Sequence, residues 1–361
     1  MKPTRTLQDL GQSLWLDNIT RALLNSGTLQ RYIDELSVTG LTSNPTIFDH
    51  AIKYSSDYDD DIARKAHSTK SPESLFFDLA LADLARAAEL FRPTYQRTDR
   101  VDGWVSLEVS PLLAHDTART VAAARDLHSR GDVPNFFIKI PGTKEGLPAI
   151  EAAIFDGIPI NVTLLFSRDQ YLAAAEAYLR AVERRIEAGL NPAVASVASV
   201  FISRWDVAVN GRTPSELSNR LGIAVGQRTY EAYRELLASR RFQRAANAGA
   251  RAQRLLWAST GTKDPNVSDT LYVDTLAAPF TVNTMPEGTL KALADHGKPH
   301  AVLANYAGDS DRVLASFAKA GIDIDALAGR LQDDGAASFV KSWNDLMSCI
   351  EFKSTTIRKA N

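Results

Sequence analysis

A lysine stands where the sequence predicts a buried strand. Residues 135–142 read NFFIKIPG, and Lys139 lies between two isoleucines, after two phenylalanines and before a Pro-Gly break. Desolvation disfavours the charged form of a buried amine, and a neutral amine is a nucleophile that forms Schiff bases with carbonyl substrates. Such an adduct is an electron sink for making or breaking the adjacent carbon–carbon bond, so Lys139 is a candidate nucleophile.

Two carboxylates interrupt apolar runs in the same way: Glu108 in GWVSLEVS (103–110) and Asp17 in SLWLDNI (13–19). Glu108 could exchange protons during formation and dehydration of a carbinolamine, through a water that Thr163 holds, and Asp17 could take the proton of a substrate hydroxyl during cleavage. Two structural roles remain open. Glu108 and Lys139 could form an ion pair across neighbouring strands, although burying such a pair is costly. Asp17 could cap the following helix.

Amide and hydroxyl side chains interrupt the other runs, at Asn44, Asn161, Thr163, Ser199 and Ser259. We expect the two amides to hydrogen-bond substrate hydroxyls. Asn44 before a proline is also a common turn sequence, and the hydroxyls could satisfy backbone groups. The period of two along a strand puts Asn161 and Thr163 on one face and the intervening apolar residues Val162 and Leu164 on the other. Polar groups on seven successive runs are hard to explain one by one.

Cations and hydroxyls suggest an anion site late in the chain. Arg204 ends the run SVFISR, and STGTK (259–263) follows the next run, ending in Lys263. Hydroxyls, a flexible backbone and cations together suit a phosphate. Arg204 could instead form an ion pair at a helix start with Asp206. A further lysine, Lys144, follows the strand of Lys139 in a loop, where a solvated surface position is expected.

Eight short apolar runs alternate with segments of helical period, which is typical of a parallel sheet built from βα units. They are residues 13–19, 39–44, 103–110, 135–142, 159–166, 197–204, 254–260 and 270–276. Eight units favour an α/β fold with a single (β/α)8 barrel over residues 1–361, with a helical extension from about residue 300. An open nucleotide-binding sheet is disfavoured, because the chain has neither G-x-G-x-x-G nor G-x-x-x-x-G-K-[ST]. In a barrel, inward polar groups near the carboxyl ends of strands mark an active site.

Helix signals separate these runs. Ser167 and Gln170 form a capping box before a periodic segment that Gly189 closes. Another helix is expected from Ser71-Pro72, and the tail places an apolar stripe on one helix face. The stripe consists of Phe339, Trp343, Leu346 and Ile350.

Composition predicts a small-molecule partner. The 361 residues carry a net charge of −2 with no long run of either sign, which argues against nucleic acid or a membrane surface as partner. One cysteine, Cys349, excludes an intramolecular disulfide. The start MKPTRTLQDLGQ lacks the apolar core of a signal peptide, and no apolar stretch reaches the roughly 18 residues of a membrane span. The six histidines show no metal-binding spacing. We expect a cytoplasmic protein.

From about Leu7 to Cys349, the sequence resembles the transaldolase family of class I Schiff-base aldolases. The motifs that carry the resemblance are SLWLDNI, GLTSNPTIF, VSLEVSPLLA, FIKIPGTKEGLPAI, GIPINVTLLFS, SVFISR and WASTGTK. It implies a (β/α)8 barrel in which Lys139 forms the Schiff base, Glu108 is the acid/base acting with Thr163 and a water, and Asp17 assists cleavage. It implies neither metal nor organic cofactor.

The resemblance also implies binding roles: Asn44, Asn161 and Ser199 hold the dihydroxyacetone part of the substrate, and Arg204 with Ser259 holds its phosphate. Shorter members of the family carry an arginine two residues after this serine. Here that position is a glycine, and Lys263, two residues further on, is the candidate second cation. In its length, the chain resembles members of the long bacterial-type branch of the family. We expect a monomer or homodimer.

The implied activity is transfer of a dihydroxyacetone unit from sedoheptulose 7-phosphate to glyceraldehyde 3-phosphate in the pentose phosphate pathway, giving erythrose 4-phosphate and fructose 6-phosphate. A related aldolase that releases free dihydroxyacetone from fructose 6-phosphate would need the same residues. The alternative from another functional class is a non-catalytic sugar-phosphate sensor. Such a protein would have no need for Lys139, Glu108 and Asp17 together.

Overall fold

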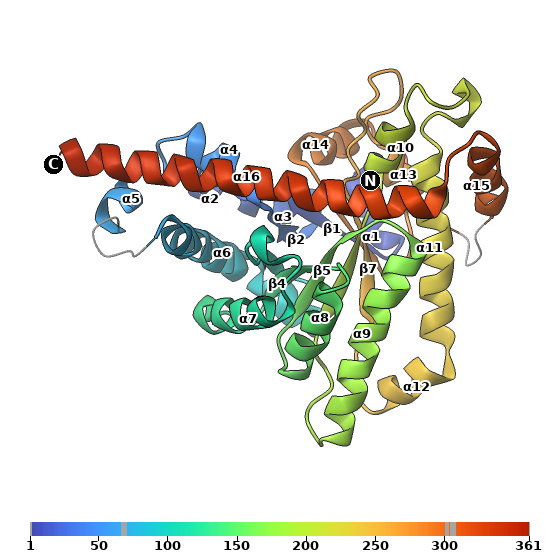
Figure 1. The fold of residues 1–361 in the computed structure, drawn as a ribbon, viewed down its shortest axis with the longest axis horizontal. Helices are drawn as coiled ribbons and strands as arrows, with labels where there is room; N and C mark the ends of the chain where they lie inside the picture. The colour runs from blue at the N-terminus through green and yellow to red at the C-terminus, as the bar shows by residue number, and fades with distance from the viewer. Residues whose placement is uncertain (1, 66–70, 300–302, 304–307, 361) are drawn as a thin grey trace.

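Eight parallel strands close into a barrel in chain order in the computed structural model, which describes residues 2–65, 71–299, 303 and 308–360 (Figure 1). The strands are β1 (Gln12–Asp17), β2 (Val38–Thr42), β3 (Val105–Glu108), β4 (Phe136–Pro141), β5 (Ile160–Leu165), β6 (Ser196–Phe201), β7 (Gln253–Ala258) and β8 (Thr281–Met285). The predicted (β/α)8 barrel is therefore confirmed, and the first seven predicted strands fall where the sequence placed them.

The eighth predicted strand was wrong. Residues Leu271–Thr275 form the short helix α13, and the eighth strand is Thr281–Met285. The helix is held at its start by Thr270, whose hydroxyl donates to Asp274. The true strand, TVNTM, is fully buried although three of its five residues are polar, so it lacks the apolar run by which the others were found.

The helices flank the strands around the barrel and at its ends (Figure 1). Before β5 they are α1 (Pro3–Asp9), α2 (Arg21–Asn25), α3 (Thr28–Leu36), α4 (Pro45–Lys53), α5 (Asp59–Lys65), α6 (Pro72–Arg97), η1 (Pro111–Leu113), α7 (Thr117–Gly131) and α8 (Gly146–Phe155). After β5 they are α9 (Arg168–Glu187), α10 (Ser203–Val209), η2 (Ser215–Leu217), α11 (Leu221–Ala238), α12 (Arg240–Asn247), α13, α14 (Glu287–His296), α15 (Ser310–Lys319) and α16 (Ile324–Ala360). The predicted start of the helical extension, near residue 300, lies outside the described residues, as do His67 and His300.

The predicted helix ends are confirmed. Ser167 and Gln170 make both bonds of the capping box of α9, and Gly189 follows that helix with a φ of +67°. Ser71 accepts a hydrogen bond from the backbone of Ser74 at the start of α6. The stripe on α16 is buried, and Trp343 packs edge-on against Phe76 of α6 at a centroid distance of 5.2 Å.

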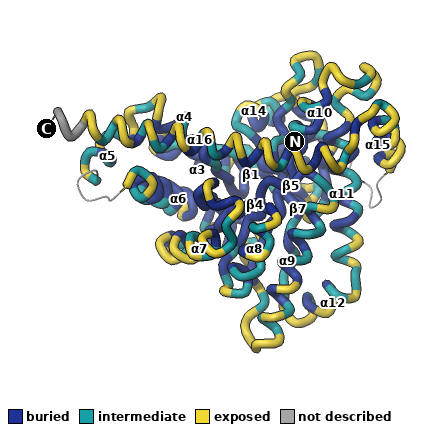
Figure 2. The backbone as a smooth tube through the Cα atoms, viewed as in Figure 1, coloured by how far each residue is buried: buried dark blue, intermediate teal, exposed yellow. Residues whose placement is uncertain are grey.

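Two apolar clusters form the core, and Figure 2 shows the buried residues concentrated along the strands and the helix faces next to them. The larger cluster joins the outer faces of the strands to the helices. The second includes inward residues of the barrel, among them Trp15, Phe137, Val197 and Val282. Alternation along each strand thus separates outer apolar residues from inner ones.

β5 departs from strict alternation. Its register with β6 shifts between Val162 and Leu165, and Leu164 has a φ of +58°. Val162 and Leu165 pack in the larger cluster, whereas Leu164 packs in the second one. The expectation that Val162 and Leu164 share a face was therefore wrong, because this irregularity turns Leu164 to the other side.

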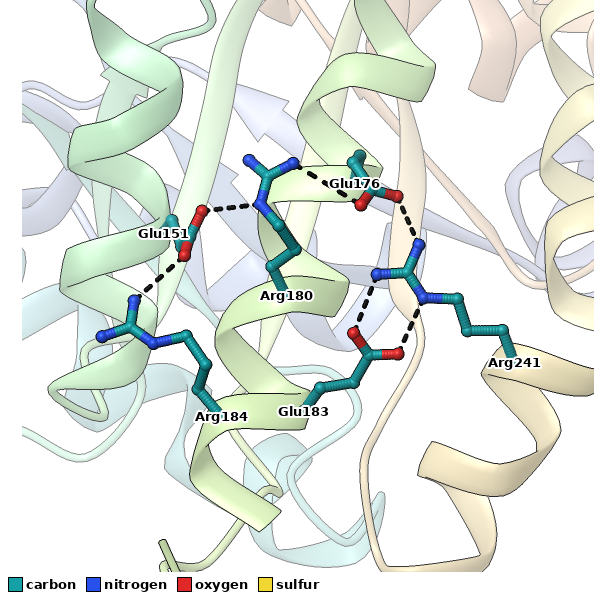
Figure 3. Close-up of polar contacts among 6 residues, drawn as sticks. All are labelled: Glu151, Glu176, Arg180, Glu183, Arg184 and Arg241. Carbon is teal, nitrogen blue, oxygen red and sulfur yellow. Dashed lines mark hydrogen bonds and ion pairs between the residues drawn. The ribbon is translucent and has the colours of Figure 1, made fainter. Parts of the chain in front are cut away.

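An ionic network ties three helices together on the outside of the barrel (Figure 3). Glu151 of α8 accepts from Arg180 at 2.8 Å and from Arg184 at 3.0 Å, both on α9. Arg241 of α12 binds Glu183 of α9 with two hydrogen bonds of 2.7 and 2.8 Å, and Figure 3 shows the parallel pairing. Bidentate arginine–carboxylate pairs of this kind restrict the geometry more than single hydrogen bonds do. The network fixes α9 between its two neighbours.

No helix within the described ranges is both long enough and apolar enough to cross a membrane.

Candidate active site

Lys139 lies inside the barrel beside Glu108. The two residues are register partners on β4 and β3, and their side chains are 3.2 Å apart between Nζ and Oε2. Nζ also donates to the backbone oxygen of Ser43 at 2.9 Å. Lys139 is 5% exposed and Glu108 3%, so the pair is shielded from bulk water. The lysine is held at the carboxyl end of its strand with its nitrogen aimed at a carboxylate.

The buried carboxyl group of Glu108 has a shifted pKa. Burial raises the pKa of its carboxyl group above the ordinary value, and the nearby carboxylate of Asp17 adds to this effect, while Lys139 opposes it. Apart from the ion pair of Oε2 with Lys139, neither carboxylate oxygen makes a hydrogen bond within the described part of the chain. The hydroxyl of Thr163 is likewise buried without a hydrogen bond there. Buried polar atoms are nearly always paired in native proteins, so these groups are candidates for contact with a ligand or water.

Asp17 ends β1 and takes part in a chain of hydroxyl groups. Thr42 of β2 donates to Asp17 Oδ1 at 2.7 Å, and Thr284 of β8 lies 2.7 Å from Thr42. A hydroxyl has one proton to donate, so Thr284 must be the donor to Thr42. Burial raises the pKa of Asp17, opposed by Lys139, Thr42 and Arg204 in that order. The alternative role as a helix cap was wrong, because Thr20 caps α2.

Asn161 has a fixed orientation on β5. Its Oδ1 accepts from the hydroxyl of Ser199 at 2.7 Å, and its Nδ2 donates to Ser106 at 3.3 Å. One proton of Nδ2 remains for a substrate oxygen. Asn44 caps α4 instead, since its Oδ1 accepts from the backbone of Ile47 at 3.1 Å. Asn44 thus starts a helix and does not form a turn, and only its amide nitrogen remains to donate to a substrate.

Arg204 lies past its strand, not at its end. β6 ends at Phe201, and Arg204 is the second residue of α10, with its guanidinium 5.0 Å from the ring centre of Phe201 and 5.9 Å from that of Phe339. Burial lowers the pKa of Arg204, and the carboxylates of Asp17 and Glu108 oppose this. The expected alternative, an ion pair with Asp206, was wrong: that carboxylate accepts from the backbone of residues 221 and 222 and from a tyrosine hydroxyl.

The other two residues of the predicted anion site differ in placement. Ser259 lies 3.0 Å from Ser203 between the hydroxyl oxygens and has a φ of +55°, a conformation that non-glycine residues rarely adopt. Lys263 is exposed and lines a cavity of about 400 Å³ together with Asp264, and neither Arg204 nor Ser259 lines this cavity. The structure therefore brings Arg204 together with the carboxylates and leaves Lys263 apart. Lys144 is exposed, as expected.

The long C-terminal helix contributes to this end of the barrel, which sequence reasoning missed. Gln332 of α16 donates to the backbone oxygens of Gly142 at 3.1 Å and Leu164 at 2.9 Å. Gly142 follows β4 directly, and Leu164 lies within β5. A Cβ atom at Gly335 would lie 3.1 Å from Nη1 of Arg204. Figure 1 shows α16 running across the molecule from α15 to beyond α4. Residues of α16, about 200 positions after β4 in the sequence, thus lie next to the candidate active site.

Thr42 and Thr284 were missed as well. Thr42 stands in the predicted second strand, two residues after Gly40. The alternation of side chains along a strand could therefore have predicted that Thr42 points into the barrel. Thr284 lies in the strand that the sequence misplaced. Among the described residues, no group of histidine, cysteine and acidic side chains could hold a metal ion.

Comparison with known proteins places the chain in a family. The model of the transaldolase/fructose-6-phosphate aldolase family matches residues 14–350. The chain belongs to this family. A protein named transaldolase from Saccharopolyspora erythraea is 44% identical over 351 residues, which cover 95% of each chain. Others so named, from Thermobifida fusca and Thiobacillus denitrificans, are 44% and 43% identical over 96% and 97% of this chain. The family predicted from the sequence motifs is confirmed.

Proposed function

We propose that the chain catalyses the transaldolase reaction, in which a dihydroxyacetone unit moves from sedoheptulose 7-phosphate to glyceraldehyde 3-phosphate. The observation that carries the proposal is the buried contact of 3.2 Å between Lys139 and Glu108, together with the buried hydroxyl of Thr163, which makes no hydrogen bond within the described residues. The name of the relatives, transaldolase, supports the same reaction. The products are erythrose 4-phosphate and fructose 6-phosphate.

The first steps use the lysine and the glutamate. Proton transfer from the ammonium of Lys139 to Glu108 gives a neutral amine and a carboxylic acid, and the raised pKa of Glu108 favours this direction. The amine attacks the ketone carbon of the substrate, and the acid then protonates the carbinolamine hydroxyl, which leaves as water. Thr163, whose hydroxyl is near the end of β5, would hold that water. The product of these steps is the protonated Schiff base.

Cleavage and transfer use Asp17. Its carboxylate accepts the proton of the hydroxyl next to the scissile bond, the carbon–carbon bond breaks, and the electron pair moves into the Schiff base. The aldehyde leaves, and the acceptor aldehyde then adds by the reverse path. Asn161 and Ser199, with the amide nitrogen of Asn44, would hold the hydroxyls of the three-carbon unit. Arg204 and Ser259 would bind the phosphate, and Lys263 is retained only as a candidate second cation.

The test is to trap the adduct. The protein is incubated with fructose 6-phosphate, reduced with borohydride, digested and mapped by mass spectrometry. A three-carbon adduct on Lys139 is expected in the parent and in Lys144→Met, which removes an exposed lysine nearby, and none is expected in Lys139→Met. Folded parent protein without any adduct would overturn the proposal and leave Lys139 and Glu108 as a structural ion pair.

The acceptor decides between the two reactions of the family. Incubation with fructose 6-phosphate alone should release little free dihydroxyacetone, and addition of erythrose 4-phosphate should yield sedoheptulose 7-phosphate. Rapid release of dihydroxyacetone without an acceptor would assign the aldolase reaction instead. A sensor without catalytic function would give no turnover in either assay.

Several further assignments belong to this proposal. Sugar phosphates are the expected partners, and we propose a cytoplasmic monomer or homodimer that acts without nucleic acid. We also take residues 1–361 as one domain, which is supported by the bonds from Gln332 of α16 to the strand ends. Size-exclusion chromatography with light scattering would decide the oligomeric state.

A further inference from the structure

A cavity of about 480 Å³ lies at the opposite end of the barrel from Lys139. Its wall includes residues at the starts of several strands: Gln12 and Ser196 are the first residues of β1 and β6, and Arg254 is the second residue of β7. Phe137 of β4 also lines it, two residues before Lys139, so the cavity is about 7 Å of strand below the nucleophile. The amino-terminal end of such barrels ordinarily serves stability, and the proposed reaction does not use it.

The walls of this cavity are mostly apolar and aromatic. Trp104 and Phe137 are stacked with ring centres 4.3 Å apart, and both contribute to the lining. At the mouth, Phe280 is 63% exposed and Val101 46% exposed. Exposed large apolar side chains around a hollow are typical of a binding site, and a volume of this size lies within the range of sites for small organic molecules.

The lining of this cavity carries more positive than negative side chains. Among the described residues that line the cavity, three are arginines, namely Arg100, Arg251 and Arg254, and one is an acid, Asp102. Asp102 is 5% exposed and accepts from the indole nitrogen of Trp15 at 2.7 Å, so it faces inward. Arg254 is occupied by the oxygens of residues 13, 101 and 281. Arg251 pairs with the exposed carboxylate of residue 99, and no ion pair of Arg100 occurs within the described ranges.

A second hollow of about 170 Å³ adjoins the first. The two share Arg100, Arg251, Trp104 and Ala195, and the smaller one adds Arg185 with no acidic residue in its described lining. The two hollows therefore meet at a pair of guanidinium groups, with an aromatic wall on one side. Guanidinium groups are suited to carboxylates and phosphates, and aromatic walls are suited to flat apolar groups.

Backbone strain marks the same place. Arg100 and Phe280 both have positive φ, +65° and +61°, and both are exposed residues of the cavity lining. The backbone N–H of Phe280 donates to Gly11 at 3.0 Å, and its carbonyl accepts from Tyr233 at 2.9 Å, so surrounding bonds impose the conformation. Strained residues held in place by their surroundings concentrate at functional sites. Leu164 and Ser259, at the opposite end, show the same conformation.

We propose that the amino-terminal end of the barrel is a second binding site, which takes an organic anion with a flat apolar body. The body lies in the larger hollow against Trp104 and Phe137, and its carboxylate or phosphate ester contacts Arg100 and Arg251 where the hollows meet. This site is independent of the transaldolase proposal, because none of its residues takes part in that chemistry.

Binding of 2-naphthoate and of its uncharged analogue 2-naphthamide tests the proposal by isothermal titration calorimetry on the whole chain. Saturating fructose 6-phosphate is present to occupy the candidate active site. We expect one naphthoate per chain and at least about tenfold weaker binding of naphthamide, as loss of one charged contact implies. The double variant Arg100→Gln, Arg251→Gln should weaken naphthoate about tenfold or more and leave naphthamide unchanged. Arg312→Gln, which removes an exposed arginine on α15, is the matched control.

A photolabel locates the site without relying on a variant. The benzophenone 4-benzoylbenzoate should label peptides that contain residues 100–104 or 251–254 on irradiation, and excess 2-naphthoate should prevent this labelling. Labelling confined to peptides of the Lys139 end would overturn the proposal. So would the absence of naphthoate binding up to its solubility limit, or equal affinities for the charged and uncharged probes.

Discussion

The two ends of the barrel use the same inward-facing positions for different purposes. On β1 the inward side chains are Trp15 and, two residues later at the strand end, Asp17; on β4 they are Phe137 and then Lys139. On β8, Val282 is followed by Thr284. A step of two residues along a strand keeps the face and changes the layer. The lower layer is apolar, with aromatic rings on β1 and β4, and the upper layer holds polar and titratable groups toward the carboxyl ends of the strands.

This difference has energetic consequences. Aromatic residues of the lower layer contribute buried apolar area and specific ring contacts, so their removal should cost stability. The upper layer contains a buried ion pair, a second carboxylate with raised pKa, and the Thr163 hydroxyl, which makes no hydrogen bond within the described ranges. None of these is an efficient means of stabilising a fold. The apolar layer below supports polar groups that are present for chemistry.

Glu108→Gln should have the largest effect on activity. The amide keeps the shape of the side chain but cannot exchange a proton, so kcat should fall by about 10²- to 10⁴-fold, the usual contribution of a general acid or base. Steady-state kinetics with fructose 6-phosphate and erythrose 4-phosphate would measure it. Because the substitution leaves the buried ammonium of Lys139 without its partner, kcat is expressed per folded molecule, with the folded fraction taken from urea unfolding. Unchanged kcat would remove Glu108 from the mechanism.

Trp104→Ala should show the opposite pattern. Trp104 is 3% exposed and packs against Phe137 and Tyr95, so the free energy of unfolding should fall by about 3–5 kcal/mol, while kcat per folded molecule should persist. Urea denaturation followed by circular dichroism gives the first value. Phe352→Ala, which truncates a ring that is 72% exposed, is the control and should stay within about 0.5 kcal/mol. Loss of activity without loss of stability would contradict the division between the two ends.

Thr42→Val should change the pH profile. The hydroxyl of Thr42 stabilises the carboxylate of Asp17 and lowers its pKa, so its removal should raise that pKa further above the ordinary value. Because the deprotonated form acts as base, the acidic limb of kcat should move to higher pH by up to about one pH unit. Thr39→Val is the matched control, since Thr39 lies at the other end of β2 and bonds the backbone oxygen of Leu14. Equal shifts in both variants would refute a specific effect on Asp17.

Phe339→Leu should have the smallest effect. The ring of Phe339 lies 5.9 Å from the guanidinium of Arg204, and its loss should weaken phosphate binding by about 0.5–1 kcal/mol, equivalent to a two- to fivefold increase in KM for fructose 6-phosphate. The value for unphosphorylated fructose should not change. Phe317→Leu on α15 serves as control. An equal increase for both sugars would show that α16 does not act through the phosphate site.

The sequence by itself determined seven of the eight strands and the identity of the polar groups on them. Lys139, Glu108 and Asp17 were found because a charge inside an apolar run is costly, and that signal is local in the chain. The same criterion missed β8, whose residues Thr281–Met285 are polar and yet buried, and it selected α13 instead. A strand that buries polar residues through partners elsewhere in the fold has no apolar run to reveal it.

Only the tertiary structure decided the contacts between distant segments. The bonds of Gln332 to the ends of β4 and β5, the donation from Thr42 to Asp17 and the ring of Phe339 near Arg204 depend on how α16 and the strands meet. The cavity of arginines and aromatic rings at the amino-terminal end depends on closure of the barrel. Periodicity along a chain specifies which face of an element a side chain occupies, but closure and crossing set which faces come together.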